Sequence, residues 1–208
     1  MIGRRLARIS RKIARRSFAW ASAAAAGTVR PRIVFIGDSI TEYWSGEDPW
    51  LFRPVRINAG IAGQTTAQMR LRFAADVVAA RPRTVHIMGG TNDLWFGEPG
   101  EGASASIANI VAMTAMARAA GIAVIVAPPP PIGRAAEPLF AHSELAAPLR
   151  AAIADHATAE RLVHVDYADS LMRDGDLVPA FTTDGVHLTR AGYRAMRAQA
   201  EAAIAAAR

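Results

Sequence analysis

The regular alternation of short apolar runs with longer helical stretches constrains this fold most. The apolar runs, rich in Val, Ile and Ala, are Ile33–Ile36, Val55–Asn58, Thr84–Met88, Ile122–Ala127 and Leu162–Val165. Runs of this length and composition are typical of parallel strands buried on both faces. Helical stretches follow at Thr65–Ala80, Ser104–Ala120, Ser143–Ala159 and Thr189–Ala206. The sequence therefore predicts an α/β domain in which helices cover both faces of a five-stranded parallel sheet.

Local signals refine this pattern. Gly121 is expected to cap the second helix, since glycine readily adopts the left-handed conformation that ends a helix. The run Pro128–Pro131 cannot be helical and is expected to wall the edge of a site beyond the fourth strand. His86 and His164 lie within apolar strand patterns, so both are expected in the core.

Charge divides the chain near residue 32. Residues 1–32 contain nine basic residues and no acidic one, whereas residues 33–208 contain 15 basic and 18 acidic residues. The net charge of +6 is therefore the sum of +9 and −3. This division predicts a basic N-terminal tail at 1–31 and a single domain at 32–208. The weakly acidic domain gives no reason to expect nucleic acid as a partner.

Three interpretations of the tail stay open. In the first, residues 1–26 are an export signal, since Arg15-Arg16-Ser17-Phe18 resembles a twin-arginine start and Ala24-Ala25-Ala26 offers a cleavage site. The protein would then be periplasmic or secreted, and otherwise cytoplasmic. In the second, apolar residues at helical spacing form an amphipathic helix on an anionic membrane. In the third, the tail is a disordered extension. No stretch approaches the 18 apolar residues of a membrane span.

Polar or glycine-rich segments directly follow three of the predicted strands. Ser39 follows the first strand, Gly60–Gly63 follows the second, and Asn92 follows the third. Because ligands bind beyond the carboxyl ends of parallel strands, these segments are expected to converge in space.

The residue types at these positions suit acyl transfer through a serine. Ser39 is the predicted nucleophile, and it requires an adjacent base because a serine hydroxyl is weak at neutral pH. His187 is the predicted base, and Asp184, three residues earlier, would orient its imidazole. The Asn92 amide and the Gly63 backbone N–H would donate to an oxyanion. Structural alternatives are a helix cap for Ser39 or Asp184 and tight turns for the glycine-rich segments.

Patterns typical of metal or cofactor sites are absent from the sequence. It has no His-Glu-x-x-His, no cysteine and no Asp-rich loop. It also has no Gly-x-Gly-x-x-Gly, and its only lysine, Lys12, is not in a Walker motif. We therefore expect a reaction without a metal or cofactor.

Four blocks of the sequence together resemble the SGNH-hydrolase superfamily, also called GDSL esterases and lipases. In chain order they are Ile36-Gly37-Asp38-Ser39-Ile40-Thr41, Asn58-Ala59-Gly60-Ile61-Ala62-Gly63-Gln64-Thr65-Thr66, Gly89-Gly90-Thr91-Asn92-Asp93 and Asp184-Gly185-Val186-His187-Leu188. The resemblance covers residues 32–204 and implies a flavodoxin-like three-layer α/β/α sandwich. It also implies a Ser39–His187–Asp184 triad and an oxyanion hole formed by the Ser39 N–H, the Gly63 N–H and the Asn92 side chain.

The function implied by the resemblance is that of a serine esterase that hydrolyses carboxylic esters through an acyl-enzyme. The short loops favour short acyl chains and a small-molecule ester as partner. A carbohydrate O-acetylesterase and a lysophospholipase are alternatives within the same fold. Four aromatic residues could form a carbohydrate platform, an acyl pocket or part of the core: Trp44, Trp50, Trp95 and Phe96. A non-catalytic binding module is the alternative from another class, and it would be expected to lose Ser39 or His187.

Overall fold

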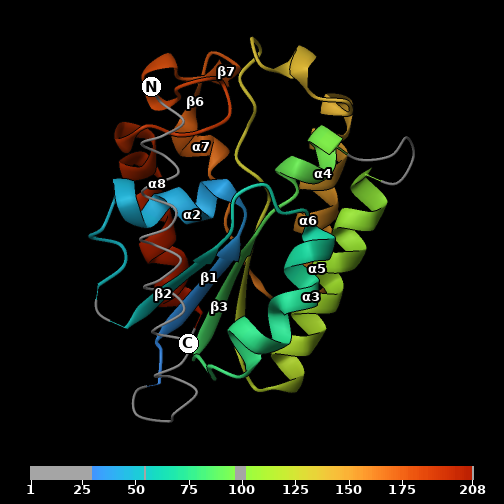
Figure 1. Cartoon of the computed structure of the whole chain (residues 1–208), viewed down its shortest axis with the longest axis vertical. Coiled ribbons are helices and arrows are strands. Elements are labelled where there is room, and N and C mark those ends of the chain that lie inside the picture. The colour runs from blue at the N-terminus through green and yellow to red at the C-terminus, as the bar shows by residue number, and fades with distance from the viewer. Residues whose placement is uncertain (1–29, 54, 97–101, 208) are drawn as a thin grey trace.

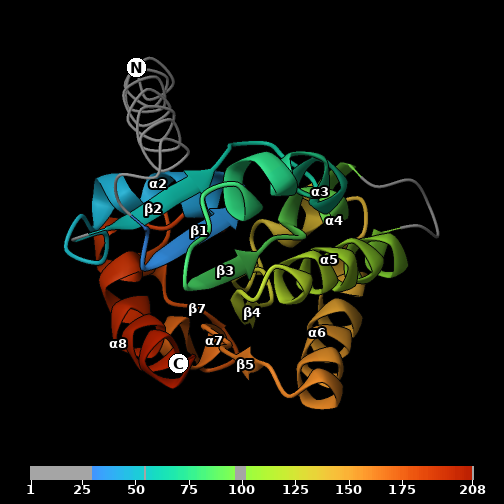
Figure 2. The same cartoon turned by 90° about the horizontal axis from the view of Figure 1, so that it is seen from below.

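The computed structural model describes residues 30–53, 55–96 and 102–207. Its centre is a five-stranded parallel sheet with the order β2-β1-β3-β4-β5 (Figure 1 and Figure 2). The strands are β1 (Ile33–Gly37), β2 (Arg56–Gly60), β3 (Thr84–Met88), β4 (Ala123–Ala127) and β5 (Val163–His164). The predicted parallel sheet is therefore confirmed, and its strand order is that of flavodoxin-like folds.

Helices cover both faces of the sheet and make a three-layer sandwich (Figure 2). One layer holds α2 (Ser39–Glu47) and α8 (Arg190–Ala206), and the other holds α3 (Thr66–Phe73), α5 (Gly102–Ala119) and α6 (Ala146–Glu160). The shorter elements are α4 (Thr91–Phe96), α7 (Ala168–Leu171), the π-helical turn Ala74–Val78, the 3-10 turns Glu137–Leu139, Ser143–Leu145 and Pro179–Phe181, and the hairpin of β6 (Met172–Arg173) with β7 (Asp176–Leu177).

The core has two halves because successive strand side chains point to opposite faces. Along β1, Ile33 and Phe35 pack with the α2 and α8 layer, whereas Val34 and Ile36 pack with the α3, α5 and α6 layer. All five residues of β1 are buried, which explains the uninterrupted apolar pattern of this strand.

The register aligns the carboxyl ends of the inner strands. Gly37 at the end of β1 lies beside Gly60 of β2 and Met88 of β3. The chain leaves β1 for β2 on one side and later returns to β3 on the other. The sheet therefore has its topological switch point at the end of β1, which is where ligands bind in open α/β sheets.

Two local expectations met different outcomes. Gly121 caps α5 as predicted, with φ of 68° and a hydrogen bond from the Ile122 N–H to the Ala117 carbonyl at 3.0 Å. His86 is buried, but His164 is exposed, so its assignment to the core is wrong. His164 lies on β5, the two-residue edge strand, where the outer side is not covered by a further strand.

Most of the predicted tail, residues 1–29, lies outside the described residues, so its boundary stays a prediction. In the described part of the chain, no helix is long and apolar enough to cross a membrane.

Candidate active site

Ser39 is the first residue of α2 and directly follows the turn that leaves β1. The N-cap of α2 is Asp38, whose Oδ1 accepts a hydrogen bond from the Ile40 N–H at 2.9 Å. Ser39 is therefore not the helix cap, contrary to the structural alternative. The first backbone N–H groups of a helix have no acceptor within the helix, so the Ser39 N–H points out of the helix start.

The predicted triad residues lie in one hydrogen-bonded line. Ser39 Oγ is 3.1 Å from His187 Nε2, and His187 Nδ1 is 2.8 Å from Asp184 Oδ2. The second Asp184 oxygen accepts hydrogen bonds from the backbone N–H groups of Val186 at 3.0 Å and His187 at 2.7 Å. Asp184 caps no helix, since the N-cap of α8 is Thr189. The loop thus holds the carboxylate and the imidazole in a fixed relation.

The surroundings of Asp184 favour its ionised form. Partial burial acts to raise its pKa, but the hydrogen bonds from the His187 ring and from two backbone N–H groups outweigh burial. The pKa of Asp184 is consequently below its ordinary value. A carboxylate that stays ionised can fix the imidazole tautomer and stabilise an imidazolium when the ring takes up a proton.

The predicted oxyanion donors lie on the neighbouring strand ends. Gly63 has φ of 79°, a conformation that favours glycine, and no atom lies within 4 Å of where a Cβ would be. Among the hydrogen bonds between described residues, none uses the Gly63 N–H. Asn92, in the first turn of α4, donates from Nδ2 to the Gln64 carbonyl at 3.0 Å. An amide nitrogen carries two hydrogens, so one N–H of Asn92 remains for a substrate oxygen.

Two buried acids fix the loop that carries Gly63, and sequence reasoning assigned neither of them a role. Glu42 Oε2 accepts from the Ala62 N–H at 2.6 Å. Asp93 accepts from the Thr66 N–H at 2.9 Å and from the Thr66 hydroxyl at 2.5 Å. Asp93 lies in the block quoted for Asn92, whereas Glu42 lies in none of the four blocks. Both acids are under 10% exposed, so their side chains are largely shielded from water.

The proline run lies against the glycine turn that precedes α4. The side chain of Pro129 is 3.5 Å from the position of a Cβ on Gly90. Further along this loop, the Gly133 N–H donates to the Gly185 carbonyl at 2.8 Å. The segment that follows β4 therefore contacts the loop of Asp184 and His187, and this agrees with its predicted place beside the site.

The four aromatic residues considered as a platform do not come together. Trp44 is fully buried in the core between the sheet and α8, and Trp50 is 62% exposed with the Arg53 guanidinium 4.7 Å above its ring. Only Trp95 and Phe96 are neighbours, with ring centroids 6.2 Å apart on α4. Phe96 is 66% exposed, so an aromatic surface is present next to the turn of Asn92.

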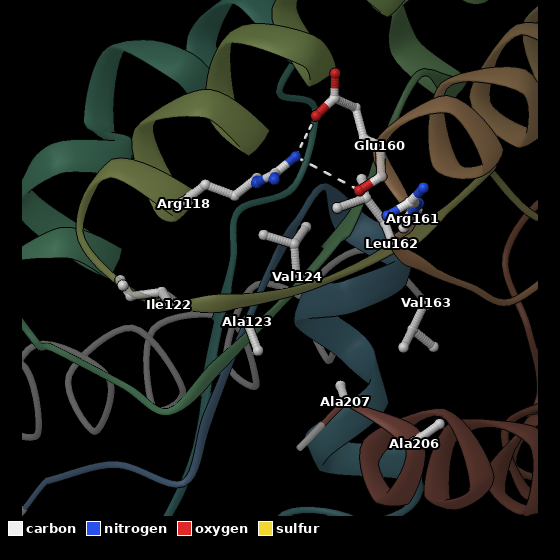
Figure 3. A pocket seen from close by; sticks show the side chains of 11 residues that line it. Arg118, Ile122, Ala123, Val124, Glu160, Arg161, Leu162, Val163, Ala206 and Ala207 are labelled. Carbon is white, nitrogen blue, oxygen red and sulfur yellow. Dashed lines mark hydrogen bonds and ion pairs between the residues drawn. The ribbon is translucent and has the colours of Figure 1, made fainter.

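A cavity of about 380 Å³ opens at the opposite end of the sheet (Figure 3). It is lined by the first residues of β4 and β5 and by the last turns of α5, α6 and α8. Arg118 is paired with Glu160 at its rim. Neither a serine nor a histidine lines this cavity, so it is separate from the triad. In the described ranges, no group of three or more His, Asp or Glu side chains could hold a metal ion.

The strand order and the polar cluster at the switch point define an α/β protein of the flavodoxin-like class. Within that class, the chain belongs to the GDSL-like lipase/acylhydrolase family of the SGNH-hydrolase superfamily, whose model matches residues 35–195. A GDSL-like lipase from Bacteroides thetaiotaomicron is 31% identical in sequence to this chain, and its crystal structure matches with a TM-score of 0.79. The match covers 90% of this chain and 96% of that one.

Two further relatives are less similar. An acetylxylan esterase from Geobacillus stearothermophilus is 20% identical over 83% of this chain and 93% of its own, with a TM-score of 0.65, and at that identity it shows the fold alone. An uncharacterized lipoprotein of Bacillus subtilis, YqeF, is 57% identical over 37 residues, which is 18% of this chain and 15% of that protein.

Proposed function

We propose that this protein is a serine esterase that hydrolyses carboxylic esters through an acyl-enzyme. The line of hydrogen bonds from Ser39 Oγ through His187 to Asp184 carries the proposal. His187 Nε2 takes the hydroxyl proton as Ser39 Oγ attacks the ester carbonyl carbon, and the resulting imidazolium is stabilised by Asp184. His187 then returns the proton to the leaving alcohol, which departs and leaves the acyl group on Ser39.

The oxyanion that forms in each step would be bound by the N–H groups of Ser39, Gly63 and Asn92. Donors fixed around a developing negative charge stabilise the transition state more than the ground state. In the second half of the reaction, water gives a proton to His187 and attacks the acyl carbon, and the acid leaves as Ser39 regains its proton. The presence of both Ser39 and His187 in hydrogen-bonding contact supports catalysis over a non-catalytic binding module.

The test of this proposal is labelling and substitution of Ser39. A fluorophosphonate probe should react with the purified protein at Ser39, as located by peptide mass spectrometry. Ser39→Ala should abolish both labelling and turnover of p-nitrophenyl acetate while its circular dichroism stays unchanged. Ser45→Ala, a serine further along the same helix, is the matched control and should retain both. Wild-type turnover in the folded Ser39→Ala protein would reject the proposal.

We expect short acyl chains to be preferred. Among the described segments at this end of the sheet, the longest connections are the one after β4 and the one between β5 and α8, which includes the β6–β7 hairpin, and neither of them forms a large apolar cap. Each buried methylene contributes only about 0.8 kcal/mol, so an open site gains little from long chains. Acetyl to butyryl p-nitrophenyl esters should therefore have a higher kcat/KM than palmitoyl esters. A kcat/KM that rises steadily to sixteen carbons would instead indicate a lipid-cleaving enzyme.

A carbohydrate O-acetylesterase is the second candidate, favoured by the exposed ring of Phe96, which lies beside the half-buried Trp95 on the helix of Asn92. Exposed rings can stack on the apolar face of a sugar, much as they pack on other apolar groups. Acetylated xylo-oligosaccharides would then be cleaved with a much lower KM than p-nitrophenyl acetate, and Phe96→Ala would remove that difference. Equal KM values for the two substrates would favour a simple short-chain esterase.

A further inference from the structure

The loop that carries Gly63 is exposed at its tip, and glycine gives its backbone exceptional freedom. An oxyanion donor nevertheless has to lie within a few tenths of an ångström of its productive position. The two residues that flank Gly63 are therefore the places where the loop can be fixed. Ala62 is held by Glu42, as described above, and Gln64 is held from two sides.

Arg72 is the residue that holds the Gln64 side chain. It lies on α3, its side chain is only 14% exposed, and its Nε donates to Gln64 Oε1 at 2.6 Å. The same guanidinium donates from Nη2 to the Gly37 carbonyl at 3.1 Å and from Nη1 to Asp76 Oδ2 at 2.8 Å. A planar guanidinium with five N–H donors can serve three acceptors at once, which a lysine ammonium does less well.

The acceptors of Arg72 connect the segments that supply all three predicted oxyanion donors. Gly37 ends β1 two residues before Ser39, and Gln64 follows Gly63 directly. The Gln64 carbonyl in turn accepts the Asn92 amide at 3.0 Å. One largely buried guanidinium and one glutamine therefore link the ends of β1, β2 and β3 at the point where the oxyanion would form.

We infer that Arg72, acting through Gln64, is a positioning residue that sets the geometry of the oxyanion hole. This inference rests on the proposed esterase function. Arg72 touches no reacting atom, so its removal should leave ground-state binding of the ester nearly intact and weaken binding of the transition state. A misplacement of about 1 Å can cost about 10²-fold in rate.

The experiment is a double-mutant cycle with Arg72→Met and Gln64→Ala, measured on p-nitrophenyl acetate. Each single variant should lower kcat by about 10-fold to 10²-fold with KM changed by less than about twofold. Because both remove the same link, the double variant should lose no more than the worse single variant. Arg72→Lys should restore only part of the loss. Arg70→Met is the matched control, since Arg70 lies on the same helix and donates to Asn109 on α5 at 3.2 Å.

Binding of a boronic acid, which forms a tetrahedral adduct on a serine, gives a second readout. Its Ki should rise in the Arg72 and Gln64 variants by the same factor as kcat/KM falls, and should stay unchanged in Arg70→Met. Gln64→Ala keeps the buried Arg72 with its other two partners, so it remains informative if Arg72→Met does not fold. Full kcat in folded Gln64→Ala, or additive losses in the double variant, would overturn the inference. A wild-type protein without esterase activity would instead reject the proposed function.

Discussion

At the scale of single residues, the proposed role of Asn92 can be tested by comparing its effect on substrate binding with its effect on binding of the transition state. Asn92→Ala should lower kcat by about 10²–10³, the usual loss for one oxyanion donor, with little change in KM. Steady-state kinetics on p-nitrophenyl acetate measures both constants. An effect confined to KM would show that the amide binds the ground-state ester. Because Asn92 also contacts the Gln64 carbonyl, thermal unfolding of the variant is the necessary control.

His86 makes stability depend on pH without taking part in the proposed reaction. Burial lowers its pKa from 6.5 to about 3, and its Nε2 lies 2.9 Å from the Tyr167 hydroxyl. Between these two pH values the unfolded chain binds a proton at His86 that the native protein does not. The contribution of His86 to stability therefore falls as the pH drops below 6.5.

His86→Gln should have a lower free energy of unfolding than the wild type at pH 7.5, because it disturbs the buried contact with Tyr167. The difference in free energy of unfolding between the two proteins should narrow on acidification. This difference should shrink by about 2–3 kcal/mol by pH 4.5, which is two pH units below the ordinary pKa of 6.5, since each unit corresponds to about 1.4 kcal/mol. Burial raises the pKa of Asp38 to about 6 and acts in the opposite sense, but this contribution is common to both proteins and cancels. Urea unfolding at the two pH values measures the gap, and a constant gap would contradict the expected protonation of His86.

At the scale of elements, the contact between β2 and α2 depends on the absence of a side chain at Gly60. A Cβ there would lie 2.2 Å from the Glu42 backbone nitrogen, which cannot move without shifting α2 and Ser39. Gly60→Ala should therefore cost about 3 kcal/mol or more and reduce activity, since overpacking a rigid contact usually costs 1–3 kcal/mol or more.

Gly121→Ala is the matched comparison. Gly121 has φ of 68° but no atom within 4 Å of a Cβ position, so alanine meets backbone strain alone. The expected cost is about 1–2 kcal/mol with unchanged kcat. Urea unfolding and ester turnover of the two variants test the contrast, and an equal loss of stability in both would show that α2 can shift to accept a Cβ at Gly60.

The elements also show what the sequence could and could not predict. β1, β3 and β4 are buried on both faces, so they produce continuous apolar runs that identify them directly. α4 has six residues after Gly89-Gly90, too short for a helical period, and the β6–β7 hairpin has two residues per strand. These elements form through tertiary contacts, such as the hydrogen bond of the His142 N–H to the Leu94 carbonyl, which leave no local pattern.

The residues of the candidate site likewise fall into those that the sequence predicts and those that it does not. Ser39, Asn92 and His187 could be proposed because their residue types and their places after strands have chemical meaning. Arg72 and Glu42 could not be proposed, because the contacts that matter here, from Glu42 to the Ala62 N–H and from Arg72 to the Gln64 side chain, join residues 20 and eight positions apart. The ion pair of Arg72 with Asp76, four residues further on, fits the local sequence but does not indicate the contact with Gln64. Positioning residues of this kind can be recognised only in the folded structure, where their hydrogen-bond acceptors lie next to them.

At the scale of the whole molecule, we expect the protein beginning at Arg30 to fold and to keep its activity on soluble esters. Arg30 and Arg32 already contact the domain, since the Arg30 Nε donates to the Arg81 carbonyl and the Arg32 N–H to the Val55 carbonyl, both at 2.8 Å. All five strands and the triad lie after this point. Melting temperature and kcat/KM of the shortened and full chains test this, and loss of either would place part of residues 1–29 on the domain.

The hydrogen bond between Ser39 and His187 joins residues 148 positions apart. The site therefore depends on a contact of very large sequence separation, a kind that forms slowly in folding. During synthesis, β1 to β4 and the serine leave the ribosome long before the loop that brings the histidine. A growing chain therefore carries an inert hydroxyl, and the proposed ester cleavage would begin only when the last quarter of the sequence docks. Recovery of hydrolysis after dilution from denaturant would consequently report the latest event of folding, whereas circular dichroism would report the earlier helices and strands.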